Sequence, residues 1–356
     1  MIPSETAPLR TPADLRAALR RYNPTPGAWI LAVVFTAALG TVYACSFFLH
    51  DRPVVWLLTF LVGLLALLGL LLGLVTSSCV CRPRAVDLVV ALAGAGMAQY
   101  LTREMQMPLL VGGAMAGTLL GIAQLWDGPL DSTAAGAGYT GVVAGMVAAT
   151  ITLHEVWILA AGVIAGAVFV MMGPTVLPGV GARMGTAGFI GASFVYLSAD
   201  VVGAERPALI PPPSSHLPHW GLVVVAVAGA LFTWALVNRG GVPYVLASAL
   251  PSLLLVSITA ATLPTHLAAV LGVAWFGGTF VGGTGLNRLP TAVWIAVAAA
   301  LFGALMLNFE GPLNGHAGVV GVTASIACLA ASGLEWLVHA RRVAHLIDRV
   351  AGDAAT

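Results

Sequence analysis

The sequence has too little charge to cover a protein with a water-facing surface. Only 8% of its residues are charged, 59% are hydrophobic and the mean hydropathy is +0.97, whereas a soluble globular domain carries roughly 25% charged residues. Between Trp29 and Val338 the sequence also lacks any polar stretch long enough to form a separate soluble domain. These absences exclude a soluble protein and a catalytic domain outside a membrane.

Lysine is absent, because all 15 basic residues are Arg, and the net charge is only +1. A nucleic-acid partner would need a clustered basic face to neutralise phosphates, so we expect none. The use of Arg alone, together with many Ala, Gly and Val residues, suggests a GC-rich bacterial genome.

Cysteine is scarce, and of the four cysteines only Cys79 and Cys81 are close in sequence. Two thiols without a nearby His or a second Cys pair do not make a typical metal site, and they do not form a disulfide framework. The sequence therefore predicts no metal and no cofactor.

Twelve apolar segments are each about long enough to cross a bilayer, which takes roughly 20 residues in a helix. The sequence therefore predicts an all-α, polytopic membrane protein with about twelve transmembrane helices and the lipid bilayer as a partner. The segments span residues 28–49, 54–77, 86–102, 108–126, 133–152, 156–172, 185–202, 219–238, 242–262, 265–284, 290–307 and 315–338.

The positions of the arginines predict the orientation of these helices, because short loops rich in Arg stay in the cytoplasm. With the N-terminus inside, twelve of the 15 Arg residues fall in cytoplasmic segments, and only Arg52, Arg103 and Arg206 fall outside. We therefore expect a multi-pass protein of the bacterial cytoplasmic membrane with both termini in the cytoplasm.

The chain contains an internal repeat, since four patches recur in the same order and at a nearly constant offset. The pairs are VVALAGA at 89–95 with VVAVAGA at 224–230, Met107-Pro108 with Val242-Pro243, AGYTGVVAGM at 137–146 with AWFGGTFVGG at 274–283, and GTAGFIGAS at 185–193 with GHAGVVGVT at 315–323. Each copy spans five helices, and this odd number makes the second copy enter the membrane from the opposite side. Such inverted repeats bracket a pathway near the midplane in many transporters.

This organisation divides the chain into six parts. They are a cytoplasmic N-terminal segment (1–27), two extra transmembrane helices (28–84), the first repeat (85–202), a Pro-rich outside linker (203–218), the second repeat (219–338) and a cytoplasmic tail (339–356).

The first candidate site is a pair of glycine motifs at equivalent positions of the two repeats. Glycines four positions apart leave one helix face without side chains, which permits a close backbone approach. One interpretation is tight helix packing, and the other is a narrow solute path bordered by two aromatic rings. The residues of this candidate path are Tyr139, Gly141, Gly145, Phe276, Gly278 and Gly282.

The second candidate site follows the Gly- and Pro-containing loops at 173–184 and 309–314, where glycines recur at every third position. Such loops indicate either flexible turns or broken segments that line a cavity. In the second case the polar groups facing the cavity are Thr186, Ser193, His316 and Thr323. His316 is open to two interpretations, an interfacial hydrogen-bonding group or a proton switch.

Charge within the predicted helices is nearly absent, and Glu335, His339 and Arg342 form a local cluster at the end of the last helix. Without a buried carboxylate, the sequence offers no evident Na⁺ site or proton relay. Motifs of zinc hydrolases, serine hydrolases and phosphate-binding loops are missing as well, so we expect no enzyme.

Three hypotheses follow. The favoured one is a transporter or channel for a small, uncharged or weakly polar solute, with the path between the two repeats. The alternative is a non-transporting membrane subunit or scaffold that binds partner helices through its glycine faces, and a homo-oligomer or partner membrane protein stays open in either case. A membrane-embedded enzyme is the third. Substitution of Gly145 or Gly282 by Leu is expected to impair function more than Arg288→Gln in a loop.

Overall fold

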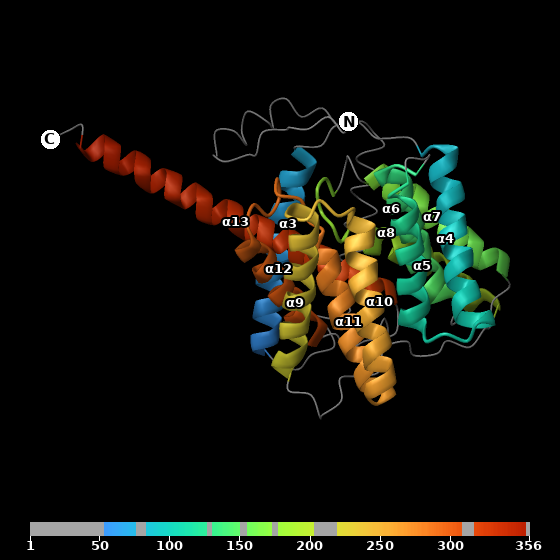
Figure 1. The fold of residues 1–356 in the computed structure, drawn as a ribbon. Coiled ribbons are helices and arrows are strands. Elements are labelled where there is room, and N and C mark those ends of the chain that lie inside the picture. Colours follow the sequence, from blue (N-terminus) through green and yellow to red (C-terminus); the bar gives the residue numbers. More distant parts are fainter. Residues whose placement is uncertain are drawn as a thin grey trace.

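The computed structural model describes residues 53–75, 83–126, 130–149, 155–172, 177–202, 219–307 and 317–353, which are helical throughout apart from short connections. The all-α fold class is confirmed for these residues. The helices, labelled in Figure 1, are α3 (Pro53–Val75), α4 (Ala85–Gln99), the π-helix η1 (Tyr100–Glu104), α5 (Leu109–Ala123), α6 (Ser132–Ala149), α7 (Glu155–Met172), α8 (Arg183–Val202), α9 (His219–Asn238), α10 (Tyr244–Thr262), α11 (Thr265–Gly282), α12 (Ala292–Leu307) and α13 (Ala317–Asp353).

These helices suit an apolar solvent. Six helical stretches of the described part are long and apolar enough to cross a membrane, and shorter apolar helices accompany them. Large apolar side chains point outward, as at Leu254, which is 58% exposed, and Val293, which is 69% exposed. Lipid tolerates such faces, whereas water does not. The fold is therefore that expected of a helical integral membrane protein.

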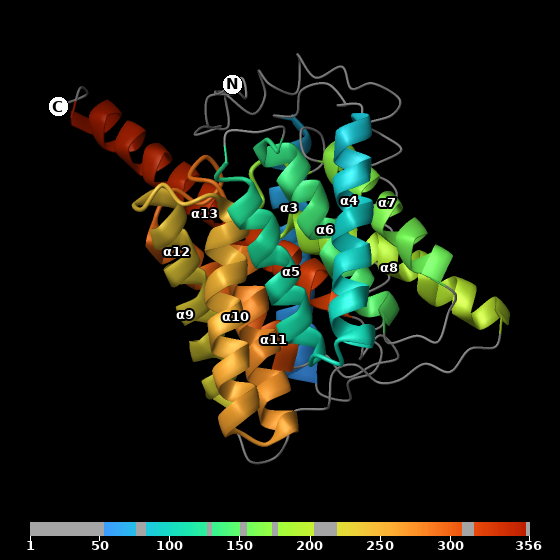
Figure 2. The ribbon, with the colours of Figure 1, turned by 45° about the vertical axis from the view of Figure 1, so that its right-hand side comes forward.

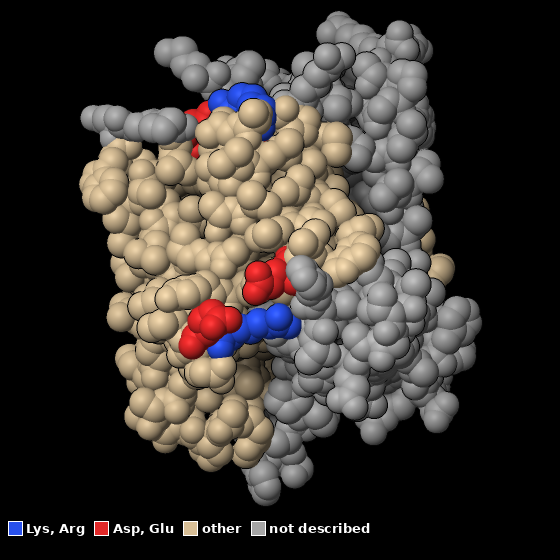
Figure 3. Space-filling model, turned by 90° about the vertical axis from the view of Figure 1, so that its right-hand side faces the viewer, with Lys and Arg blue, Asp and Glu red and all other residues tan. Residues whose placement is uncertain are grey.

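Charged side chains are distributed as expected for a protein that crosses a membrane. Figure 3 shows Arg with Asp or Glu gathered at two levels of one face, with an uncharged band between them. In the described part of the chain, Arg84 lies at the start of α4, Asp131 before α6, Glu104 at the end of η1 and Glu155 at the start of α7.

The helices form two groups that lie side by side, α4–α8 on one side and α9–α12 on the other, with α13 reaching from the second group to the first (Figures 1 and 2). Within the first group α4 packs on α6 and α7, and within the second α9 packs on α11 and α12. Between the groups, α5 packs on α10 and α8 packs on α13. Helix α3 packs on α13.

The same turn connects α4 to α5 and α9 to α10. Gln106 and Gly241, which directly precede the repeated pairs Met107-Pro108 and Val242-Pro243, both adopt the left-handed conformation, with φ of 53° and 65°. The next backbone N–H donates six positions back in each case, from Met107 to Leu101 (3.1 Å) and from Val242 to Leu236 (3.0 Å). A left-handed residue after the last turn is a common end of a helix, and these bonds satisfy carbonyl groups of that turn.

Proline then starts the following helix in both places. Pro108 and Pro243 have φ/ψ of −52°/138° and −54°/136°, and their carbonyl groups accept the first helical hydrogen bonds, from Gly112 and Ala247, at 2.9 Å each. Proline suits this position because it has a fixed φ and no backbone N–H that needs a partner.

Eleven of the twelve predicted segments coincide with helices of the structure to within a few residues, except at the end of α13. The first segment, 28–49, and the linker, 203–218, lie outside the described residues, so the count of twelve stays a prediction. Helix α13 continues to Asp353, well beyond the predicted end at residue 338, and projects away from the bundle (Figure 1). The predicted tail is therefore helical over much of its length.

Candidate functional site

A cavity of about 380 Å³ lies between the two groups of helices. Both groups contribute to it, α5 and α6 from the first and α10, α11 and α13 from the second. It begins at the end of the bundle where α5 and α11 start, beside Pro108 and Thr265, and extends inward to Tyr139 and Phe280. We call this end of the bundle the cavity end. None of the described residues that line the cavity is charged.

Three aromatic rings stand at the inner limit of the cavity. Tyr139 and Phe276, the predicted aromatic pair, both line it, and the sequence did not point to the third ring, Phe280. The ring centroid of Phe280 lies 6.2 Å from that of Tyr139 and 6.4 Å from that of Phe276, edge-to-face in both cases. Such arrangements are favourable for aromatic quadrupoles. The rings therefore form one cluster across the boundary between the two groups.

A set of buried hydroxyl groups lies behind this cluster. The Tyr139 hydroxyl lies 3.3 Å from the Ser248 hydroxyl, which in turn lies 2.8 Å from that of Thr279. Thr279 also donates to the carbonyl oxygen of Phe276, at 2.8 Å. These bonds satisfy the polar atoms and join α6, α10 and α11. Polar groups that can bond a weakly polar molecule thus stand next to an apolar cavity.

The glycines of the first motif lie in helix packing rather than on the cavity wall. A methyl group at Gly141 would collide with the carbonyl oxygen of Ala91 on α4, and one at Gly145 would lie 2.6 Å from that of Ala95. In the second group, Gly278 and Gly282 meet the carbonyl oxygens of Ala226 and Ala230 on α9 in the same way. Each glycine pair allows two helices of one group to touch at their backbones.

The glycines of the second motif bring α8 and α13 together. A Cβ atom on Gly185 would lie 2.5 Å from the Cα atom of Gly321, so the two helices cross at backbone contact. Beside this crossing the Thr186 hydroxyl bonds that of Ser325, at 2.7 Å. The two copies of the second glycine motif therefore contact each other where α8 crosses α13. Helices α5 and α10 form another contact between the two groups.

The remaining predicted polar groups are dispersed. Thr323 is buried on α13, and its hydroxyl has no hydrogen-bond partner in the described part of the chain. Ser193 is half-buried on α8, whereas His316 lies outside the described residues. At the end of the last predicted span, His339 Nδ1 lies 3.8 Å from Glu335 Oε1, which agrees with part of the predicted charge cluster. The side chain of Arg342, its third member, lies outside the described part of the chain.

At the opposite end of the bundle, the described parts of the loops before α8 and α12 bond to neighbouring helices, and we call this the sealed end. The Tyr244 hydroxyl donates to the carbonyl oxygen of Gly181 at 3.4 Å, and the Gly181 N–H donates to the Thr284 hydroxyl at 3.2 Å. Thr284 also lies 3.3 Å from the Cys328 sulfur. The described part of this Gly- and Pro-containing loop, residues 177–182, is thus largely buried and bonded, and sequence reasoning did not identify its partners.

Arg288 belongs to the same end, and no sequence motif pointed to its importance. It lies in the loop between α11 and α12, yet it is only 8% exposed. Its Nε donates to the carbonyl oxygen of Pro178 at 2.8 Å and its Nη1 to that of Gly69 on α3 at 3.3 Å. A buried guanidinium that bridges two loops and a helix is costly to disturb. The expectation that Arg288→Gln impairs function less than the glycine substitutions did not take this burial into account, and it stays a prediction.

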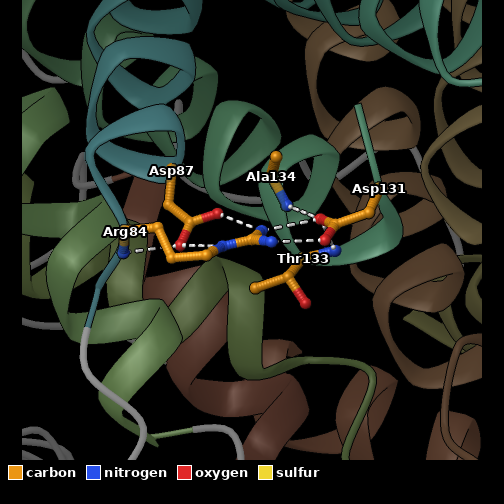
Figure 4. A network of polar contacts seen from close by, with 5 residues as sticks. All are labelled: Arg84, Asp87, Asp131, Thr133 and Ala134. Atoms are coloured by element: carbon orange, nitrogen blue, oxygen red, sulfur yellow. Dashed lines mark hydrogen bonds and ion pairs between the residues drawn. The ribbon is translucent and has the colours of Figure 1, made fainter. Parts of the chain in front are cut away.

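An ion-pair network fixes the starts of α4 and α6 (Figure 4). The Arg84 guanidinium lies 2.7 Å from a carboxylate oxygen of Asp87 and 2.7 Å from one of Asp131. Asp131 also accepts hydrogen bonds from the N–H groups of Thr133 (3.0 Å) and Ala134 (2.8 Å), which caps α6. The hydrogen bonds from Arg84 lower the pKa of the Asp131 carboxyl to about 2. None of these five residues is among those that line the cavity.

No protein-family model, curated protein or solved structure matches this chain. Function is therefore argued from the cavity and the helices around it.

Proposed function

We propose that this protein is a membrane transporter or channel for a small, uncharged or weakly polar solute, with a path between two inverted five-helix repeats. The observation that carries the proposal is the cavity, which has walls from both helix groups, ends at an aromatic cluster and has no charged residue among its described lining residues. An apolar cavity of this size suits a small neutral molecule.

The relation between the two groups is supported by matching contacts. Gly141 meets Ala91 as Gly278 meets Ala226, and these four residues occupy equivalent positions of the repeated sequence patches. The paired turns at Gln106 and Gly241 add backbone geometry that composition alone does not produce. Helix neighbours correspond too, because α4 packs on α6 as α9 packs on α11. These shared contacts and turns support a relation between the two groups beyond their common Ala- and Gly-rich composition.

The orientation of the repeats follows from the number of helices. Helix α9 is the fifth span after α4, so these equivalent helices run in opposite directions through a membrane if every helix crosses it. Two pairs of helices pack across the boundary, α5 with α10 and α8 with α13. In this arrangement the two members of each pair are related by a pseudo-two-fold axis. The cavity lies beside this axis because α5, α6, α10 and α11 all line it.

The glycine packing favours transport over the scaffold alternative. A scaffold would present its glycine faces to partner helices, but Gly141 and Gly145 are covered by α4, and Gly278 and Gly282 by α9. The side chains that do face outward are large and apolar, such as Leu254 and Val293, and lipid satisfies them.

Flux into proteoliposomes tests the proposal. A panel of small neutral probes, such as glycerol and acetamide, identifies a permeant, and wild-type flux must exceed that of empty vesicles. Ala268→Trp or Val143→Trp would place an indole in the cavity, and we expect each to reduce flux at least 10-fold. Val224→Trp is the control, since Val224 is 55% exposed on the outer face of α9. Equal flux in all three variants would rule out this cavity as the path.

A further inference from the structure

The cavity end and the sealed end differ in a systematic way. If α5 and α10 are equivalent with Pro108 aligned to Pro243, and α6 and α11 with Gly141 aligned to Gly278, then each contact at one end has a counterpart at the other. Two contacts of the sealed end show the difference. The inference rests on the proposed function, because the repeat defines which residues correspond.

The first contact joins α5 to α10. A Cβ atom on Gly121 would lie 2.7 Å from Cα and 2.8 Å from Cβ of Leu246, so the helices touch at this point. The counterparts are Val256 for Gly121 and Val111 for Leu246, and both line the cavity. The same pair of helices is therefore closed at one end and separated by the cavity at the other.

The second contact joins α10 to α11. The ring of Tyr244 lies against Gly283, so closely that a methyl group there would collide with it. The counterparts are Leu109 for Tyr244 and Met146 for Gly283, and again both line the cavity. The two sealed-end contacts involve four residues, and the counterparts of all four line the cavity.

Between the two ends α5 and α10 cross at small residues. A Cβ atom on Gly117 would lie 2.9 Å from that of Ala249. A close crossing at this point lets the two helices rock about it, with one end closing while the other opens. Contacts within each group, such as Gly141 on Ala91, need not change during that motion.

We propose that the protein is an alternating carrier in which the sealed end is a closed gate. Because the two repeats share their local structure, each can adopt the arrangement of the other, and the exchange converts a cavity at one end into a cavity at the other. In the exchanged state Val111 meets Val256 and Leu109 meets Met146. Tyr244 leaves Gly283 and Gly181, and the hydroxyl groups of Ser248 and Thr279 become reachable from the former sealed end.

A cysteine pair at the cavity end tests this proposal directly. In a variant with Cys45, Cys79, Cys81 and Cys328 replaced by Ser, Val111→Cys and Val256→Cys are combined. The counterpart separation of 2.8 Å between Cβ positions at Gly121 and Leu246 indicates that the exchanged state brings them within disulfide reach, which needs Cβ atoms roughly 3.5–4.5 Å apart. We expect oxidation to cross-link the pair and to reduce flux at least 10-fold, and reduction to restore it.

Two controls make the result specific. Val111→Cys with Leu254→Cys should not cross-link, because Leu254 is 58% exposed on the outer surface. For Val111→Cys alone and Val256→Cys alone, flux after oxidation should equal the flux of the same variant before oxidation. A cross-linked Val111/Val256 pair that still transports, or a pair that never cross-links in an actively transporting protein, would overturn the gate.

The outcomes separate the gate from the proposed function. Trans-stimulation of labelled-solute uptake by unlabelled solute inside the vesicles supports a carrier, and its absence with undiminished flux supports a static channel, which would overturn only the gate. Absence of flux for every probe in the wild-type protein, together with reversible cross-linking, would contradict the proposed function and leave the motion intact.

Discussion

Replacing Gly278 by Ala gives a sharp test of the packing between α9 and α11. Helix propensity alone favours Ala over Gly by about 1 kcal/mol. The new methyl group, however, would collide with the Ala226 carbonyl oxygen and lie 2.9 Å from its carbon and 3.0 Å from its Cα. These atoms belong to a helix backbone and do not rotate away, so the helices must separate. Overpacking costs about 1–3 kcal/mol, and a collision with backbone atoms belongs to the upper part of that range, about 2–3 kcal/mol. After the gain in helix propensity, we expect a net loss of about 1–2 kcal/mol of stability.

The measurement is reversible unfolding in detergent, followed by circular dichroism. Gly141→Ala is the equivalent change in the first group and should cost the same within about 0.5 kcal/mol, because it meets Ala91 with the same geometry. Gly96→Ala is the matched control, since its nearest atom is Leu159 Cδ2 at 3.6 Å, and it should be neutral or stabilising. Wild-type stability in Gly278→Ala would refute the backbone contact.

Further predictions concern the turns, the buried arginine, the helix cap and the glycine faces. Gly241→Ala should lower stability by about 1 kcal/mol because the φ of this residue is 65°, and no steric clash adds to the loss, since no atom lies within 4 Å of the new methyl group. Gln106→Gly should not destabilise the protein. Unfolding midpoints that change in the opposite order would contradict the shared turn. Arg288→Met should lower stability by about 2–4 kcal/mol through loss of the bonds to Pro178 and Gly69; an unchanged midpoint in denaturant would be inconsistent with its burial. Asp131→Ala should cost about 1 kcal/mol more than Asp131→Asn, because Asn still caps α6. Because the pKa of Asp131 is lowered, the ionised carboxylate contributes fully to stability above pH 3.8, its ordinary pKa, and this contribution is lost as the pH falls to about 2. Stability measurements on wild type and Asp131→Asn between pH 6 and 2 would reveal the loss. Gly145→Leu and Gly282→Leu should each impair both folding and flux, since both glycines contact the backbone of a neighbouring helix. Full flux in either variant would show that function does not require this close contact between helices.

The positions of the helices could be predicted from the sequence because apolar runs and their ends are local features. Pro108 and Pro243 start the helices that follow them, and Gly241 occupies a turn that requires a positive φ. Gln106 occupies the equivalent turn without being a glycine, so only the repeat offset relates the two. Helix α13 extends further than its apolar part because a helix does not need lipid to continue.

Which side of each helix packs against another helix and which side lines the cavity could not be predicted from the sequence. A helix that is apolar all round gives no periodic signal for its inner side, so the sequence did not distinguish whether Gly141 packs or lines a path. The aromatic pair Tyr139 and Phe276 does reach the cavity, but Phe280 completes the cluster through tertiary packing. The burial of Arg288 could not be predicted, because its partners, Pro178 and Gly69, are distant in sequence.

Solute-protected blocking of a single cysteine in the cavity tests the central claim most directly. Ala269 lines the cavity and is half-buried, so Ala269→Cys in the cysteine-free variant should react with a small thiol reagent. We expect modification to reduce flux at least 10-fold, and a saturating permeant solute to slow the reaction. Unchanged flux after complete modification would contradict a solute path between the two helix groups.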